Sequence, residues 1–359
     1  MPKFFYALEY GLIYRYVMQS DGSLSTLGEP VSCINAVDIA YSNASRFAGG
    51  DNYLFVISTT PAGAEACQGI SVYHVENDGS LTERVTYYCD GVGSSPQDII
   101  ALWWYGTDSY FVYIVNRGVT GSEISGYRFS ESGSIEFLGD PLTPLPADLA
   151  IDTISLFEIV AEDGAGGHPS RPVPCVYALY TTPCGKTKIA SFEIDESGFL
   201  NYAGSSISSD GIGIALAATP QGDFSYITHS NINSIAGSTV GAGRFQPLGP
   251  VAQMTSHGPC VACPEGKYLF VSAIADHSYV IISYRIGADG LLVQSDQKPC
   301  GAGIWTLGIE PDGQYLYAPS SDGLVYIYQI NRNDGTLVPK PPSPRSNGGN
   351  VCGMAILDV

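Results

Sequence analysis

The stretch Gly303–Val338, GIWTLGIEPDGQYLYAPSSDGLVYIYQINRNDGTLV, contains four short strand signals separated by turn residues. The expected strands are Ile304–Ile309, Tyr315–Pro319, Leu324–Ile330 and Thr336–Val338. The strands are separated by the motifs P-D-G, D-G and N-D-G. Proline fixes φ and glycine accepts a positive φ, so these motifs indicate tight turns. Four antiparallel strands on so short a period are typical of one propeller blade, provided that the pattern repeats.

The pattern repeats along the whole chain. Its last hairpin, an aromatic or apolar strand followed by D/S-G-x-L, has six clear copies and one degraded copy. The clear copies are Tyr14–Gly28, Ile70–Arg84, Ile124–Gly139, Ile189–Gly204, Ile281–Ser295 and Val325–Lys340, and the degraded copy is Ile235–Gly249. Self-similarity at this spacing favours a propeller over other all-β folds.

The two ends of the chain predict how the ring closes. Lys3–Glu9 has the pattern of a second strand with no first strand before it, and Val351–Leu357 has that of a first strand with nothing after it. The C-terminal strand can therefore complete the N-terminal blade and leave no open edge. We expect one all-β domain over residues 1–359, a seven-bladed propeller with four antiparallel strands per blade.

Charge and composition restrict the partners. The chain has 16 Lys and Arg against 35 Asp and Glu, a net charge of −19, which disfavours nucleic acid and anionic membranes as partners. The sequence contains no run of 18 apolar residues, so it predicts no membrane-spanning helix. No signal peptide precedes the first strand, so we expect a cytoplasmic protein or a secreted one whose signal has been removed. The oligomeric state stays open.

The nine cysteines do not predict a metal site. Cys260 and Cys263 form a C-x-x-C motif on a first strand, where their side chains point to opposite faces, and no second pair has matching spacing. Cys67 and Cys89 flank a hairpin and can face each other across it, so a disulfide between them is geometrically allowed.

Alignment of the repeats places polar residues at the beginnings of first strands and the ends of second strands. Both sets meet on one face of a propeller, at the mouth of the central channel. The expected catalytic residues are His229, His257, Arg117 and Asp98, and the expected substrate-binding residues are Trp305, Asp38, Gln97, Glu9, Tyr10, His277 and Cys260. A channel aspartate also commonly caps backbone amides, and an arginine in an acidic chain also forms ordinary ion pairs, so those structural roles stay open.

The repeat resembles the lactonase-like seven-bladed propellers, which include 6-phosphogluconolactonase and the fungal carboxy-muconate cycloisomerase. The P-x-G-x-Y-L hairpins Pro264–Val271 and Pro311–Tyr317 and the D-G-S-L hairpins carry this resemblance. Where the family has G-P-R-H, this chain has Gly211–Ile214, G-I-G-I. The resemblance therefore implies the fold more strongly than the hydrolysis of a phosphorylated lactone.

Three functions follow as hypotheses. In length, acidity and lost lactonase motifs the chain is similar to the fungal hetero-Diels–Alderases of tropolonic sesquiterpenes. This resemblance implies a cyclase of secondary metabolism that joins a quinone methide to a terpene alkene without a cofactor. The first alternative is a lactonase or cycloisomerase with divergent acid–base residues, such as Asp98 with His257. The second alternative is a non-catalytic propeller that binds a protein or glycan.

Overall fold

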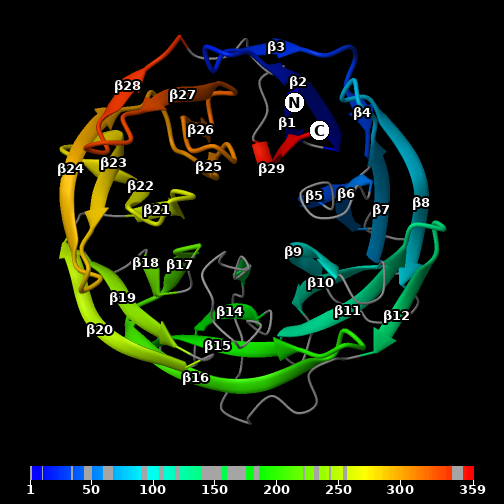
Figure 1. Cartoon of the computed structure of the whole chain (residues 1–359), viewed down its shortest axis with the longest axis horizontal. Helices are drawn as coiled ribbons and strands as arrows, with labels where there is room; N and C mark the ends of the chain where they lie inside the picture. Colours follow the sequence, from blue (N-terminus) through cyan, green and yellow to red (C-terminus); the bar gives the residue numbers. More distant parts are fainter. Residues whose placement is uncertain are drawn as a thin grey trace, which may run out of the picture.

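The computed structural model of the chain is a ring of seven β-sheets arranged about a common axis (Figure 1). The structure describes residues 2–9, 11–33, 35–43, 51–59, 68–89, 95–104, 109–117, 122–139, 155–159, 175–181, 186–220, 223–229, 234–241, 244–253, 257–341 and 351–359. These residues form strands and turns and contain no helix. The prediction of an all-β, seven-bladed propeller is confirmed.

Each blade has an inner, a second, a third and an outer strand, paired antiparallel in that order. The inner strands, from blade 1 to blade 7, are β29 (Val351–Asp358), β5 (Ala36–Asn43), β9 (Ser95–Trp104), β13 (Ser155–Ile159), β17 (Gly213–Ala218), β21 (His257–Ala262) and β25 (Gly308–Ile309). The second strands are β1 (Lys3–Glu9), β6 (Asn52–Thr59), β10 (Ser109–Arg117), β14 (Cys175–Thr181), β18 (Phe224–His229), β22 (Tyr268–Ala275) and β26 (Tyr315–Pro319).

The remaining strands form the outer half of each blade. The third strands are β2 (Leu12–Met18), β7 (Gln68–Val75), β11 (Ser122–Ser130), β15 (Lys186–Ile194), β19 (Ser234–Gly241), β23 (Ser278–Ile286) and β27 (Val325–Ile330). The outer strands are β3 (Leu24–Thr26) with β4 (Val31–Ser32), β8 (Leu81–Cys89), β12 (Ile135–Gly139), β16 (Leu200–Asp210), β20 (Arg244–Gln253), β24 (Leu292–Pro299) and β28 (Leu337–Pro339). Blade 1 therefore has its outer strand in two pieces, both paired with β2.

The ring closes as the sequence predicts. Strand β29 pairs antiparallel with β1, so that Lys3 lies opposite Asp358 and Leu8 opposite Gly353. The two ends of the chain consequently lie next to each other in one blade (Figure 1).

The inner strand of blade 7 is shorter than its sequence predicts. Regular pairing covers only Gly308–Ile309, whereas Ile304 makes an isolated bridge to Ser320. Between these two points the inner strand has one residue more than β26, so the predicted run of ladder hydrogen bonds is interrupted.

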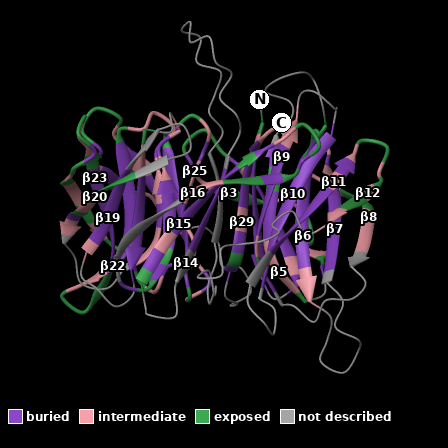
Figure 2. Ribbon diagram, turned by 90° about the horizontal axis from the view of Figure 1, so that it is seen from below, coloured by how far each residue is buried: buried purple, intermediate pink, exposed green. Residues whose placement is uncertain are grey.

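Seven apolar clusters of the described residues form the core, one at each junction between neighbouring blades. Consecutive residues are buried along second strands such as β1 and β6, so both faces of these strands lie in the core (Figure 2). The cysteines of the C-x-x-C motif separate accordingly: Cys260 packs between blades 5 and 6, and Cys263 between blades 6 and 7. Cys67 lies outside the described residues, as does the side chain of Cys89.

The same contact joins neighbouring blades at four of the described junctions. An aromatic ring near the start of a second strand packs on the glycine in the outer hairpin turn of the following blade, and a tyrosine two residues later donates a hydrogen bond to that glycine's carbonyl. At the junction of blades 3 and 4, Phe111 packs on Gly198 and the Tyr113 hydroxyl lies 2.8 Å from the Gly198 carbonyl oxygen. The same arrangement joins Phe4 and Tyr6 to Gly79, Phe224 and Tyr226 to Gly290, and Tyr315 and Tyr317 to Gly22.

We predict that Gly198→Ala destabilises the protein more than Gly133→Ala. Both glycines have a positive φ in equivalent turns, so both substitutions impose backbone strain of about 1–2 kcal/mol. A Cβ at Gly198 would also overlap the Phe111 ring, whereas no atom lies within 4 Å of a Cβ at Gly133. Urea unfolding of both variants measures the difference, and equal losses of stability would contradict a role for the contact.

Candidate functional site

The inner strands bulge where they begin. In blade 2, Ala36 pairs with Ser58 but Asp38 pairs with Ile57, which leaves Val37 as an extra residue. Corresponding extra residues are Cys352 in blade 1, Gln97 in blade 3, Ile214 in blade 5 and the pair Gly258–Pro259 in blade 6. A bulge bends its strand and changes the direction of the side chains beside it. At one end of the ring, side chains beside these bulges are therefore redirected in a similar way from blade to blade.

The residue after the bulge occupies the same structural position in each of these blades. It is Gly353 in blade 1, Asp38 in blade 2, Asp98 in blade 3, Ala215 in blade 5 and Cys260 in blade 6. The two aspartates thus stand on consecutive inner strands, β5 and β9, which pack side by side (Figure 1).

Asp38 and Asp98 form a carboxyl pair. Their side chains share a hydrogen bond, and Asp38 also accepts hydrogen bonds from the backbone N–H groups of Ile39 and Ile99. The Ile99 amide lies 2.9 Å from Oδ1 of Asp98. The aspartates therefore cap backbone amides, as one of the two interpretations of the sequence expects, and in addition bind each other.

Burial raises the pKa of Asp38 well above its ordinary value, and the charge of Asp98 and the hydrogen bond between the two carboxyls raise it further. Two adjacent carboxylates cannot both ionise at low cost, so the pair holds a proton under conditions in which an exposed aspartate has lost it. The two carboxyls therefore share a proton through the hydrogen bond between them.

The polar residues described at the ends of the second strands are buried. His229 is fully buried, with Nδ1 3.1 Å from the Ser234 carbonyl oxygen. Asn116 is also buried and donates from Nδ2 to Ser125 Oγ, 2.8 Å away. Glu9 is buried as well, and its charge contributes to the raised pKa of Tyr16, whose main cause is burial.

Other predicted residues differ in exposure. Trp305, Gln97 and His277 are exposed, and His277 lies in the turn between β22 and β23 with a φ of 62°. Cys260 is buried, and burial raises the pKa of its thiol to about 12. A thiol in this state is a poor nucleophile at neutral pH.

Three predicted residues lie partly or wholly outside the described part of the chain. Tyr10 is outside it, and the side chains of Arg117 and His257 are not described. The backbone of His257 begins the inner strand of blade 6, whereas Asp98 stands in blade 3. Asp98 has Asp38 as a partner, and a pairing of Asp98 with His257 stays a prediction. The sequence carries a signal for the pairing of Asp98 with Asp38, since V-D-I-A and Q-D-I-I occupy the same position in consecutive repeats.

Exposed apolar side chains gather on other blades at the same end of the strands. They are Ile212 and Ile214 in blade 5, Tyr279 in blade 6 and Trp305 in blade 7, exposed by 43, 37, 41 and 52%. Tyr279 lies beside Gly303, which connects it to the segment that holds Trp305. Blades 5, 6 and 7 therefore expose apolar side chains at this end, and blades 2 and 3 carry the Asp38–Asp98 pair.

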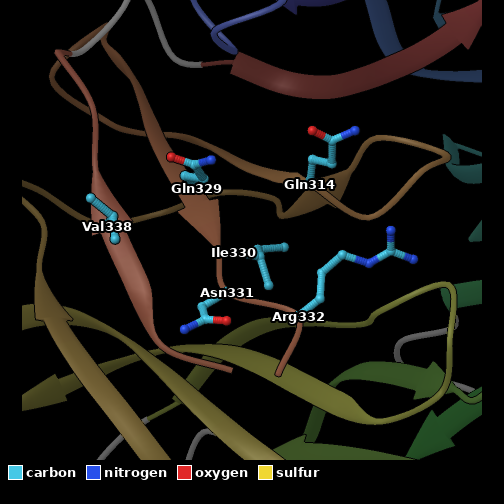
Figure 3. A pocket seen from close by; sticks show the side chains of 6 residues that line it. All are labelled: Gln314, Gln329, Ile330, Asn331, Arg332 and Val338. Carbon is cyan, nitrogen blue, oxygen red and sulfur yellow. The ribbon is translucent and has the colours of Figure 1, made fainter. Parts of the chain in front are cut away.

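A surface hollow of about 480 Å³ lies elsewhere, on blade 7 (Figure 3). Its lining residues are Gln314, Gln329, Ile330, Asn331, Arg332 and Val338. Gln314 follows the turn that joins the inner to the second strand, so the hollow is at the opposite end of the strands from the aspartate pair. None of the predicted site residues lines it.

Metal ligands and membrane-spanning helices are both missing from the described residues. These residues contain no group of three or more His, Cys, Asp and Glu side chains placed to hold a metal ion. The described part of the chain also lacks a helix with the length and apolar character needed to cross a bilayer.

Comparison with solved structures shows the fold. A protein from Lactobacillus plantarum superposes with a TM-score of 0.75 at 13% identity and covers 100% of both chains. A Bacteroides uniformis protein described as a "putative 6-phosphogluconolactonase" gives a TM-score of 0.71 at 14% identity over 99% of both chains. Sqt1 of Chaetomium thermophilum, bound to the N-terminus of the ribosomal protein L10, gives 0.55 at 13% identity, over 88% of this chain and 77% of that chain. No protein-family model and no curated protein sequence matches this chain.

We predict that Asp38→Asn makes the protein relatively more stable at high pH. Between about 3.9, the pKa of an unfolded aspartate, and the raised pKa of Asp38, the folded state keeps a proton that the unfolded chain has lost. Each pH unit gained within this window therefore removes about 1.4 kcal/mol of wild-type stability, and an amide abolishes that loss.

Urea unfolding as a function of pH measures this effect. Asp78→Asn is the matched control. Hydrogen bonds from Ser80 hold the pKa of Asp78 below its ordinary value, so the Asp78 carboxylate contributes stability that rises with pH, opposite to the effect of Asp38. A wild-type stability profile that Asp38→Asn leaves unchanged would contradict the shared proton.

Proposed function

We propose that this propeller is a small-molecule enzyme in which the protonated Asp38–Asp98 pair donates a hydrogen bond to a substrate carbonyl. The observation that carries the proposal is the hydrogen bond between two carboxyls on neighbouring inner strands. A neutral carboxylic acid fixed in this way stabilises negative charge as it develops on a carbonyl oxygen.

The surroundings of the pair support a neutral, largely apolar substrate. A net charge of −19 repels anions, which disfavours phosphorylated sugars and dicarboxylates. Exposed Ile212, Ile214, Tyr279 and Trp305 present apolar surface at the same end of the ring. A substrate with one carbonyl and a hydrocarbon portion matches both sets of groups.

The reaction that this arrangement supports best is a hetero-Diels–Alder cycloaddition of a quinone methide with a terpene alkene. One C–O and one C–C bond form together, no group leaves, and the acid keeps its proton at the end of the cycle. A hydrogen bond to the quinone methide oxygen makes the diene more electrophilic, and the apolar surface holds the alkene in a reactive pose. This reaction needs neither a nucleophile nor a bound cofactor.

Lactone opening or cycloisomerisation is the second candidate, and the same pair favours it. Two carboxyls that share one proton provide a general acid and a general base, which can protonate the leaving oxygen and activate water. The Bacteroides uniformis neighbour, described as a "putative 6-phosphogluconolactonase", adds support at the level of the fold. The acidity of the chain points to an uncharged lactone.

We expect the pH dependence to separate the two reactions. If the protonated pair only polarises a carbonyl, the cycloaddition rate is constant at low pH and falls along a single limb as the raised pKa of Asp38 is passed. Lactone opening by an acid and a base gives a bell-shaped profile. In either reaction Asp38→Asn should lower kcat about 10²- to 10³-fold.

The assay uses a quinone methide generated in solution with a humulene-type alkene, and a set of uncharged lactones. Asp276→Asn is the control, because Asp276 is exposed in a turn at the same end and its positive φ accepts asparagine. Full activity of Asp38→Asn and Asp98→Asn toward every substrate would exclude the pair from catalysis.

Trp305→Ala tests the apolar part of the site. We expect KM to rise about tenfold or more with little change in kcat, because a large apolar side chain that is buried on binding contributes about 1.5–3 kcal/mol. Trp305 is exposed in the free protein, so its loss leaves the core intact. Phe137→Ala, equally exposed on β12, should change neither parameter. An unchanged KM for Trp305→Ala would remove the residue from the substrate site.

A further inference from the structure

We propose that Gly353, on the closing strand β29, is a positioning residue for the Asp38–Asp98 pair, and that the C-terminal strand is therefore part of the site. The proposal rests on the proposed function for its catalytic meaning. Its structural content stands on the geometry between β29 and β5 alone.

Gly353 leaves the space that the Asp38 carboxyl occupies. A Cβ at this position would lie 2.5 Å from Oδ1 of Asp38, 2.9 Å from Cγ2 of Ile39 and 3.2 Å from the Ile39 nitrogen. Even a methyl group would thus displace the carboxyl.

The backbone does not require glycine at this position. Gly353 is not among the described glycines with positive φ, so alanine fits its conformation. The demand for glycine comes from the neighbouring carboxyl. This separates Gly353 from the turn glycines such as Gly198, where conformation and contact act together.

Gly353 occupies the same position in its repeat as Asp38 and Asp98 do in theirs. Gly353, Asp38 and Asp98 follow the bulges of three consecutive blades. The first of the three carries no side chain, so the second turns its carboxyl into a seam bounded by β29 and by Asp98. Among the described groups, Asp98 of β9 is the titratable group that acts on Asp38, whereas the Cys352 thiol of β29 is directed to the Leu8 carbonyl oxygen, 3.4 Å from its Sγ. The strand that closes the ring therefore also helps to position the Asp38 carboxyl.

Titration of the carboxyl in the free protein tests this directly. The γ-carboxyl signals of ¹³C-labelled aspartate are followed against pH in the full chain, and the signal lost in Asp38→Asn identifies Asp38. Gly353→Ala should lower the titration midpoint of Asp38 by about one pH unit, because the displaced carboxyl loses part of its burial and its hydrogen bond to Asp98. Gly258→Ala is the matched control on the inner strand of blade 6: its new methyl group crowds Ser272 and should leave the Asp38 midpoint unchanged.

A double-mutant cycle keeps the test valid if Gly353→Ala weakens folding. Asp38→Ser shortens the side chain that the new methyl group meets, so the stability lost in Gly353→Ala should be largely recovered in the double variant. Equal losses in both backgrounds, or an unchanged midpoint in Gly353→Ala, would overturn the proposal.

Neither readout uses substrate. If the midpoint moves but activity does not depend on Asp38, the positioning role holds and the proposed function fails. If activity depends on Asp38 but Gly353→Ala changes neither the midpoint nor the rate, the proposed function holds and the positioning role fails.

Discussion

The contact between an aromatic ring and a turn glycine of the next blade sets the distance between neighbouring blades at four junctions of the ring. A blade is a small sheet that buries its faces only against its neighbours, so the stability of each blade depends on the distance to the next. The ring of Phe111 and the hydroxyl of Tyr113 fix that distance at Gly198, and similar groups do so at other junctions. Between blades 2 and 3 no atom lies within 4 Å of a Cβ at the turn glycine Gly133, so the meeting of Asp38 and Asp98 depends there on the apolar cluster that packs the two blades together.

Ring closure serves both stability and the site. Strand β29 gives blade 1 its inner strand, and the junction of blades 7 and 1 has the Tyr317–Gly22 hydrogen bond and an ion pair between Lys3 and Glu310, 2.8 Å apart. The same strand then places Gly353 against Asp38. A propeller whose two ends share one blade thus couples the completion of its fold to the completion of its acidic pair.

The candidate site combines two physical environments at one end of the ring. Blades 2 and 3 contribute a carboxyl pair in which burial and the neighbouring charge raise the pKa of Asp38, and blades 5 to 7 contribute exposed apolar side chains. The bulges create this arrangement, because each inserts a residue where an inner strand begins and redirects its neighbours. Both His229 and Cys260 are buried: His229 bonds to the Ser234 carbonyl of its own blade, and Cys260 packs between blades 5 and 6.

The sequence by itself determined the blades, since turn glycines, aromatic strand runs and their period are local features that recur along the chain. It also determined the closure by Val351–Asp358 and the end of the ring where Asp38, Asp98 and Trp305 lie. Only the tertiary structure decided that Asp98 meets Asp38, and that Gly353 makes room for the pair. The physical reason is that these residues come from different blades. Their contact depends on the packing distance between the blades and on a bulge that shifts the register by one residue. A local sequence pattern encodes neither of these.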